Sequence, residues 1–169
     1  MGLHQQRDLA FEAPPDWFES TVAAFKAPAT EVGPEIVLLV AREPLMPNDT
    51  LEGHMGRTLL KLGKELDDVV MGETRELEVG ARRALSVRVE FEASSGRFEQ
   101  TLVMVDPTRD PDGQVWVFVS TAPLERREEA SAALERVLFT ARFEAPEEPP
   151  KSFEALPPVP MPALRPGRP

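Results

Sequence analysis

The sequence predicts an α+β fold in which two main helices pack on a curved antiparallel sheet of about six or seven strands. Three observations lead to this prediction. Short apolar segments with strand periodicity dominate residues 9–144, only two segments have the apolar spacing of a helix, and short turns join successive strands. Because strands and helices do not alternate regularly, a doubly wound parallel sheet is a poorer match.

The chain divides into three parts. Residues 1–8 are expected to be a flexible N-terminus, 9–144 a single binding domain, and 145–169 a disordered tail. With 169 residues and 41% hydrophobic content, the chain can fill one core, and two domains would be hard to fit. Nine of the 18 prolines fall in the tail, where missing backbone donors oppose helix and strand. A docking peptide with a PxxP-like surface is the alternative for this tail.

The first strands are short and apolar. Residues 9–12 predict one strand, and residues 20–27 predict a second with Val22 and Ala24 on one face. After a Gly-Pro turn, residues 36–41 are continuously apolar. A strand of that composition requires cover on both of its faces.

A helix follows, with Asp49 or Thr50 as its N-cap because each offers a side-chain oxygen to the free amides of the first turn. Its apolar residues recur at steps of three and four, so they form one stripe against the sheet. The stripe consists of Leu51, Met55, Leu59, Leu62 and Leu66.

The rest of the domain is predicted as four strands, a helix and a closing strand. The four strands span residues 69–79, 85–92, 97–106 and 115–119. The turn at Ser94-Ser95-Gly96 is short enough to require antiparallel pairing of its two strands. Residues 124–138 then form an amphipathic helix, and 139–143 a short last strand.

Apolar surface is the main functional feature of the sequence. Residues 36–41, 102–105 and 115–119 are apolar in both strand registers, whereas two short helices are expected to cover only one sheet face. The second face is then buried by loops, helices and a partner subunit, or it is an apolar groove for a helix or peptide of another protein.

No group of residues with catalytic spacing is found. The chain has no cysteine, and its only imidazoles are His4 and His54, so nucleophilic and zinc chemistry lack their usual residues. The acidic segment 106–113 lacks the alternating ligands of a calcium loop and suits a strand connection. We therefore expect a protein that is not an enzyme and that uses neither a metal nor a cofactor.

The net charge and the composition of the N-terminal residues are the features that bear on binding partners and cellular compartment. The formal net charge of −10, without a cluster of basic residues, argues against nucleic-acid binding. The N-terminus lacks the apolar run of a signal peptide, and no stretch reaches the roughly 20 apolar residues of a membrane span. A cytoplasmic protein that is not itself embedded in a membrane is expected.

The pattern of residues resembles the DcrB-related family and, within it, the Eag chaperones, which are adaptors of type VI secretion effectors. Three segments and the basic residue Arg57 carry the resemblance, which extends over residues 9–144. The segments are Phe11-Glu12-Ala13-Pro14-Pro15-Asp16-Trp17, Ser20-Thr21-Val22-Ala23-Ala24-Phe25 and Val37-Leu38-Leu39-Val40-Ala41-Arg42-Glu43.

The resemblance implies a PsbP-like sandwich, often a homodimer, whose concave sheet shields the apolar N-terminal transmembrane helices of an effector before export. An apolar sheet suits this task because a membrane helix in water exposes a long apolar surface. The effector-helix binding groove is expected at Val22, Ala24, Val37, Leu39, Ala41, Thr58, Leu62, Gln100 and Leu102.

Three positions depart from the family pattern. Val37 and Ala41 lack the hydroxyl groups that serines supply at these places, and Thr58 replaces a glutamine. These departures argue against the family's usual recognition of polar groups on the cargo, and a purely apolar grip is compatible with them. The alternative function is a scaffold domain without chemistry, whose second sheet face forms a homodimer interface.

Overall fold

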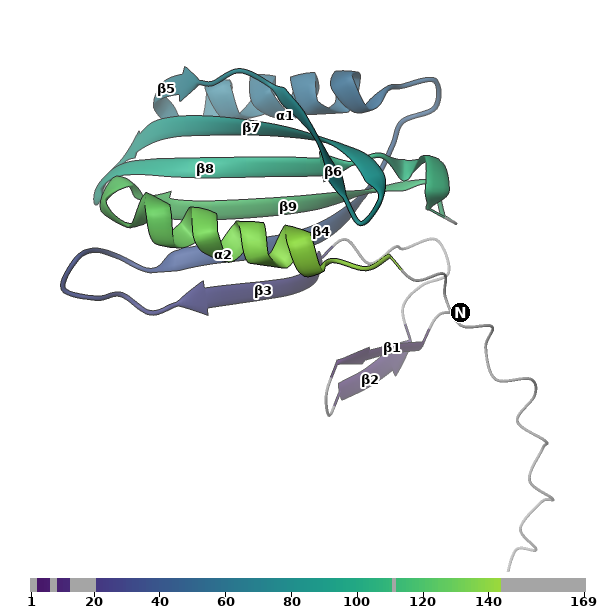
Figure 1. Cartoon of the computed structure of the whole chain (residues 1–169), viewed down its shortest axis with the longest axis horizontal. Coiled ribbons are helices and arrows are strands. Elements are labelled where there is room, and N and C mark those ends of the chain that lie inside the picture. The colour runs from purple at the N-terminus through teal and green to yellow at the C-terminus, as the bar shows by residue number, and fades with distance from the viewer. Residues whose placement is uncertain (1–2, 7–8, 13–20, 111, 144–169) are drawn as a thin grey trace, which may run out of the picture.

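A computed structural model describes residues 3–6, 9–12, 21–110 and 112–143. Its main body is a seven-stranded antiparallel sheet that carries two helices (Figure 1). The predicted α+β class with a curved antiparallel sheet is confirmed. The expected tail at 145–169 lies outside the described residues.

The elements follow one another in the order of their labels. The strands are β1 (Leu3–Gln6), β2 (Leu9–Glu12), β3 (Thr21–Ala27), β4 (Ile36–Pro44), β5 (Asp67–Met71), β6 (Arg75–Val79), β7 (Arg82–Ala93), β8 (Gly96–Val105) and β9 (Gln114–Pro123). The helices are α1 (Leu51–Glu65) and α2 (Arg127–Thr140), with short 3₁₀ turns at Pro107–Arg109 and Leu124–Arg126.

The sheet has the strand order β3-β4-β9-β8-β7-β5, and β6 pairs with the first part of β7. Strands β7, β8 and β9 are neighbours in the sheet in the order in which they follow along the chain, and β7 pairs antiparallel with β8 as their short turn predicted. The pairing of β4 with β9 joins distant segments, for example Leu39 with Val119. The predicted strand at 9–12 exists, but it pairs with β1 in a separate hairpin.

Two predicted strands differ from the structure. The segment 69–79 is divided into β5 and β6, which pair with different parts of β7. The segment 139–143 is not a strand, because α2 continues to Thr140 and the chain then caps the sheet with Phe143. Helical spacing continues through Val137, Leu138 and Ala141, so packing against the core decides the outcome.

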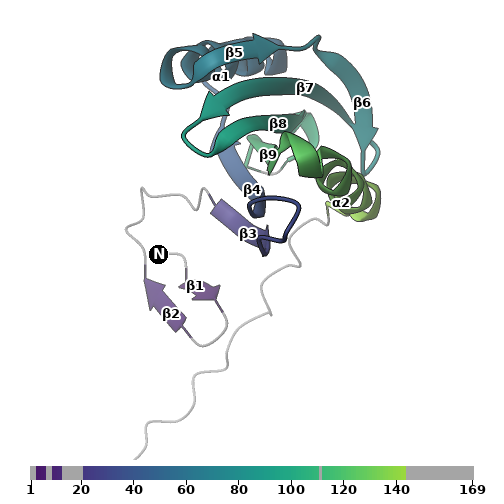
Figure 2. The ribbon, with the colours of Figure 1, turned by 90° about the vertical axis from the view of Figure 1, so that its left-hand side faces the viewer.

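The two helices lie on opposite faces of the sheet (Figure 2). Met55 of α1 packs with Leu102 and Met104 of β8. Leu134 of α2 packs with Val103 and Val105 of the same strand. Since successive strand residues point to opposite faces, the strand is apolar on both sides. The expectation that both helices cover one face is wrong, and most of the two-sided apolar pattern is explained by the chain's own helices.

Two polar contacts fix the ends of the helices. Thr50 is the N-cap of α1, and its hydroxyl accepts a hydrogen bond of 3.0 Å from the backbone N–H of Gly53. Arg126, 4% exposed, donates to the carbonyl oxygens of Pro28 at 2.7 Å and Pro34 at 2.8 Å. Because these carbonyls belong to the β3–β4 loop, Arg126 joins that loop to the start of α2.

Candidate functional site

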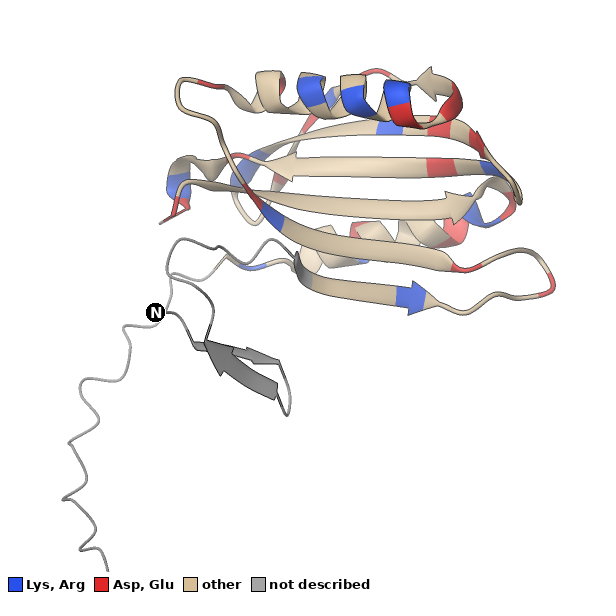
Figure 3. Ribbon diagram, turned by 180° about the vertical axis from the view of Figure 1, so that it is seen from behind, with Lys and Arg blue, Asp and Glu red and all other residues tan. Residues whose placement is uncertain are grey.

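Helix α1 covers only part of its face of the sheet. It contacts β5, β7 and β8, and no described helix lies on the part of the same face formed by β9, β4 and β3 (Figure 3). We call this region the open apolar half-face. It consists of Ala24, Val37, Leu39, Gln100, Val119 and Thr121.

The register of the strands places these residues in two adjacent rows. Ala24, Leu39 and Val119 are successive cross-strand partners in the first row. Val37, Thr121 and Gln100 are successive partners in the second row. Directly opposed side chains in antiparallel strands share a face, so four strands contribute to one continuous surface.

Exposure within this surface decreases toward α1. Ala24 is exposed, and Val37, Leu39 and Val119 are half-buried. By contrast, Ala41 is 8% exposed and Leu102 is 3% exposed, in the cluster that packs beneath Met55. Ala41 and Leu102 lie on the predicted face, but the structure places them in the core, where a docked partner could not reach them.

One polar pair interrupts the apolar surface. The side-chain amide of Gln100 donates a hydrogen bond of 3.1 Å to the hydroxyl of Thr121. The Gln100 carbonyl oxygen is buried and accepts no hydrogen bond from any described residue. An unpaired acceptor of this kind is costly in an apolar setting.

The remaining predicted residues lie beside this surface. Leu62 packs on the cluster beneath α1. The hydroxyl of Thr58 donates a hydrogen bond of 3.1 Å to the backbone oxygen of His54. Thr58 is therefore held by its own helix. Val22 lies in β3 at an irregularity of the register between Thr21 and Ala23, and its side chain lies outside the described residues.

Val119 and Thr121 are not among the site residues that the sequence predicts. The sequence places Val119 in a strand that needs cover on both faces, and Thr121 lies beyond the predicted end of that strand. The available signal is the continuously apolar run 115–119, which indicates a strand without assigning its faces. It could not show that Val119 lies directly between Leu39 and Leu102, because that depends on pairing between distant strands.

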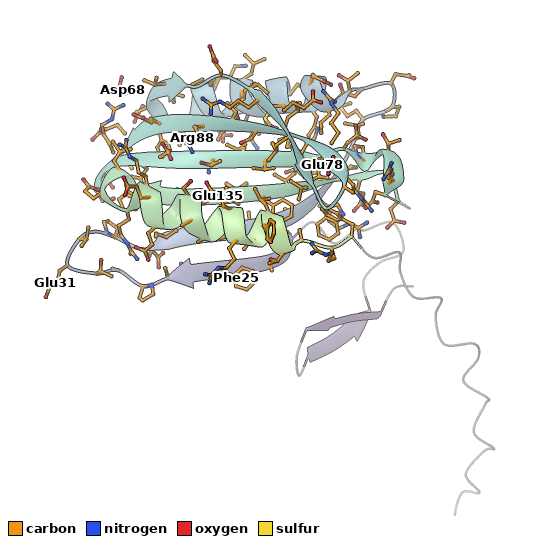
Figure 4. The ribbon with its side chains drawn as sticks, in the orientation of Figure 1. Phe25, Glu31, Asp68, Glu78, Arg88 and Glu135 are labelled. Carbon is orange, nitrogen blue, oxygen red and sulfur yellow. The ribbon has the colours of Figure 1, made fainter. Side chains whose placement is uncertain are left out.

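The opposite face also has a part, over β7, that none of the described helices covers. Two hollows of about 240 and 510 Å³ lie between α2 and strand β7. Charged and hydroxyl side chains line much of both hollows, and apolar side chains such as Leu77 and Leu138 complete the smaller one. Arg88 and Glu135 mark its position in Figure 4. Glu90 and Glu99 are opposed directly across β7 and β8 there. The uncovered region over β7 is thus largely polar, whereas the half-face beside α1 is apolar, as is a further hollow between β3 and α2 that is lined by Phe25, Leu38 and Val137.

Within residues 3–6, 9–12, 21–110 and 112–143, no group of three or more His, Cys, Asp or Glu side chains is arranged to hold a metal ion. His54 is engaged by Glu43, with 2.7 Å between Nε2 and the carboxylate. No described helix has the length and apolar character needed to cross a membrane.

A family model described as DcrB matches residues 9–140. This match covers most of the chain and nearly all of the main sheet and its helices. No curated protein gave a significant match.

Solved structures with the same fold include two bacterial proteins. PA94 from Pseudomonas aeruginosa, described as a protein of unknown function, has a TM-score of 0.69 at 14% identity, covering 86% of this chain and 98% of that chain. LpqN from Mycobacterium tuberculosis, described as involved in cell envelope biogenesis, has a TM-score of 0.50 at 15% identity, covering 75% and 78%. At these identities the likeness concerns the fold alone.

Proposed function

This chain belongs to the DcrB family, and we propose that it is a binding protein without catalytic chemistry that uses the open apolar half-face to hold apolar helices of another protein. The observation that carries the proposal is the unequal character of the two uncovered sheet regions. The hollow between α2 and the strands β7 and β8 is lined mainly by charged groups, whereas the region beside α1 presents Leu39, Val37 and Val119. Apolar surface left uncovered marks a site of association.

A helix is the occupant that best suits the shape of this surface. The half-face spans β3, β4 and β9, with α1 running along its border (Figure 3). Another helix placed beside α1 on the sheet would complete the layer that α1 begins. Helices that pack on a sheet bury an apolar stripe, and each buried methylene group stabilises the contact by about 0.8 kcal/mol.

The specific role that we propose is that of a cytoplasmic chaperone for a type VI secretion effector. The cargo would be the transmembrane-type N-terminal helices of the effector, which need an apolar cover before export. The resemblance to the Eag chaperones supports this role, as does the apolar half-face. The protein LpqN, which shares the fold, is described as involved in cell envelope biogenesis, and effector helices of this type are themselves destined for a membrane.

Co-expression tests the proposal. The full chain is produced with a tagged N-terminal segment of an effector encoded beside it, and the soluble fraction of that segment is measured with and without the chain. We expect the segment to become soluble and to retain the chain on the affinity resin. A segment that stays insoluble and retains none of the chain would refute the chaperone role.

A homodimer that buries the same surface is the second candidate. β3 is an edge strand in the described sheet, and the half-face extends to it, so a second copy could cover both. A sedimentation series over protein concentration separates the two cases. Loss of a dimer in Leu39→Asp and Val22→Asp, with no cargo bound by the native chain, would favour the scaffold function.

A further inference from the structure

Another hollow on the α2 side of the sheet, of different chemistry from the two beside β7, lies at the end of α2. Its volume is about 580 Å³. Aromatic and apolar side chains form much of its lining, with several arginines among them. Its lining includes Val40, Arg42, Arg82, Trp116, Val137 and Phe143. The cargo site proposed above uses the other face, so this hollow needs an explanation of its own.

The acidic side chains in the hollow already have partners. Asp110 accepts hydrogen bonds of 3.0 Å from the indole N–H of Trp116 and 3.2 Å from Arg42 Nη2. Its carboxylate also accepts from the backbone N–H groups of Asp112 and Gln114. Asp110 therefore holds Trp116 and Arg42 in place and has little capacity left for a further donor.

The arginines retain unused donors. Arg42 lies 5.1 Å from the centre of the Trp116 ring, and its Nε–H is buried without a hydrogen-bond partner among the described residues. Arg82 lies 4.4 Å from the centre of the Phe143 ring, and its Nη1 is likewise buried and unpaired within the described part of the chain. A buried donor without a partner destabilises the protein, so an acceptor placed in the hollow is favoured.

We propose that this hollow is a carboxylate-binding site and that its ligand is the acidic segment that follows Phe143 in this chain, residues 144–148. A carboxylate is the natural partner of a guanidinium group because its two oxygens accept from several N–H donors. The segment reads Glu-Ala-Pro-Glu-Glu, which supplies three carboxylates in five residues. It begins at the hollow itself, since Phe143 is part of the lining.

The position of Phe143 favours this ligand over one from another molecule. Its ring lies 5.8 Å from that of Trp116, and Gly80 packs so closely that an added Cβ would lie 2.8 Å from the Phe143 ring. Phe143 thus anchors the chain directly beside Arg82. A carboxylate on the adjoining residues reaches the site at low entropic cost, because the preceding residue is already fixed.

If residues 144–148 bind in this hollow, the first residues of the Pro-rich tail are held against the sheet. The hollow lies on the α2 side, so residues 144–148 bound there would direct the rest of the tail away from the open apolar half-face. The carboxylate site stands independently of the helix-binding function, because its residues belong to the other face of the sheet.

The experiment uses the full chain with Trp17→Phe, which leaves Trp116 as the only tryptophan. Hydrogen exchange of the amides of residues 144–148 and the fluorescence of Trp116 are measured. The variant replaces Glu144, Glu147 and Glu148 with Gln, and Glu154→Gln is the matched control. We expect the triple variant to exchange at least tenfold faster and to shift the Trp116 emission, and the control to do neither. Raising NaCl from 50 to 500 mM should also speed exchange in the parent chain.

A second arm identifies the source of the carboxylate. The peptide acetyl-Glu-Ala-Pro-Glu-Glu-amide, or its Gln form, is titrated into the triple variant. Restoration of the parent Trp116 emission by the Glu peptide alone supports the proposal. Equal exchange in the parent and triple variants overturns the assignment of the tail as ligand, even if the added peptide binds. Failure of both the exchange difference and the peptide overturns the carboxylate site as well.

Discussion

Ala24 on β3 and Leu39 on β4 are directly opposed in the antiparallel pairing of these strands. Both lie on the face of the sheet that carries α1, in the part of that face that α1 does not cover. Ala24 is exposed and Leu39 is half-buried. Ala24 therefore offers a place to change the binding surface without disturbing the core, whereas Leu39 reports on the surface and the core together.

Ala24→Asp should weaken capture of an apolar helix with little effect on folding. An unpaired carboxylate in an apolar contact costs about 2 kcal/mol, which corresponds to a loss of affinity of roughly thirtyfold. Pull-down of the effector segment and thermal unfolding measure the two effects. Leu60→Asp is the control, because Leu60 is 66% exposed on the outer side of α1. Equal binding by Ala24→Asp and the native chain would exclude this face as the site.

Arg126→Met should destabilise the domain by about 2–4 kcal/mol. The substitution keeps an unbranched side chain but removes two charged hydrogen bonds to backbone carbonyls, which together contribute about 3–6 kcal/mol, and two more to the exposed Glu129 carboxylate. The apolar methionine side chain, buried in the same place, offsets part of this loss. Urea unfolding measures the change. The neighbouring exposed Arg127, changed to Met, should shift the free energy of unfolding by no more than about 0.5 kcal/mol. A similar loss in both variants would show that the contacts of Arg126 with the β3–β4 loop contribute nothing specific.

Substitutions at the turn between β6 and β7 should have opposite signs. Gly80 and Ala81 have φ values of 54° and 60°, as a two-residue hairpin turn requires. Ala81→Gly should stabilise the domain by up to about 1 kcal/mol, because alanine disfavours the left-handed region. Gly80→Ala should cost about 2 kcal/mol or more, because the same conformational penalty adds to a clash with Phe143. Urea unfolding of both variants provides the measurement, and a stabilised Gly80→Ala would contradict the packing of Phe143.

Asp110 should make stability depend on pH under acid conditions. Burial alone raises the pKa of Asp110, but hydrogen bonds from the backbone of Gln114 and Asp112 and from Trp116, with the charge of Arg42, outweigh it and leave the pKa lowered. The stabilisation is therefore complete above the unfolded pKa, near 3.8, and is lost as pH falls through the lower folded pKa.

Asp110→Asn should accordingly unfold at lower urea than the native chain at pH 7 and lose less additional stability on moving toward pH 2. Asp112→Asn is a suitable comparison because its side chain is 65% exposed. If Asp110→Asn kept the full pH dependence of the native chain, the acid sensitivity would have to arise from other groups.

Thr50→Ala should lower the stability of the domain by about 1 kcal/mol, because the backbone N–H of Gly53 loses its acceptor. Thr50→Ser retains the oxygen and should recover most of the loss, as measured by the midpoint of urea unfolding. Equal losses in the two variants would indicate that the methyl group of Thr50, and not its hydroxyl, matters.

The sequence by itself determined the features that depend on near neighbours. Steps of three and four residues defined the stripe on α1, Asp49 or Thr50 marked its start, and a short turn required antiparallel pairing of its two strands. These signals are strong because the residues involved lie within one or two turns of each other.

Only the tertiary structure decided which face of the sheet each helix covers and how much of it. An alternating or fully apolar strand shows that its faces need cover, but the cover comes from residues far along the chain. The pairing of Leu39 with Val119 and the burial of Ala41 and Leu102 follow from packing summed over the whole sheet. For that reason the sequence predicted an apolar binding face without its limits. In the structure α1 buries part of that face, and the other half is left for the proposed binding.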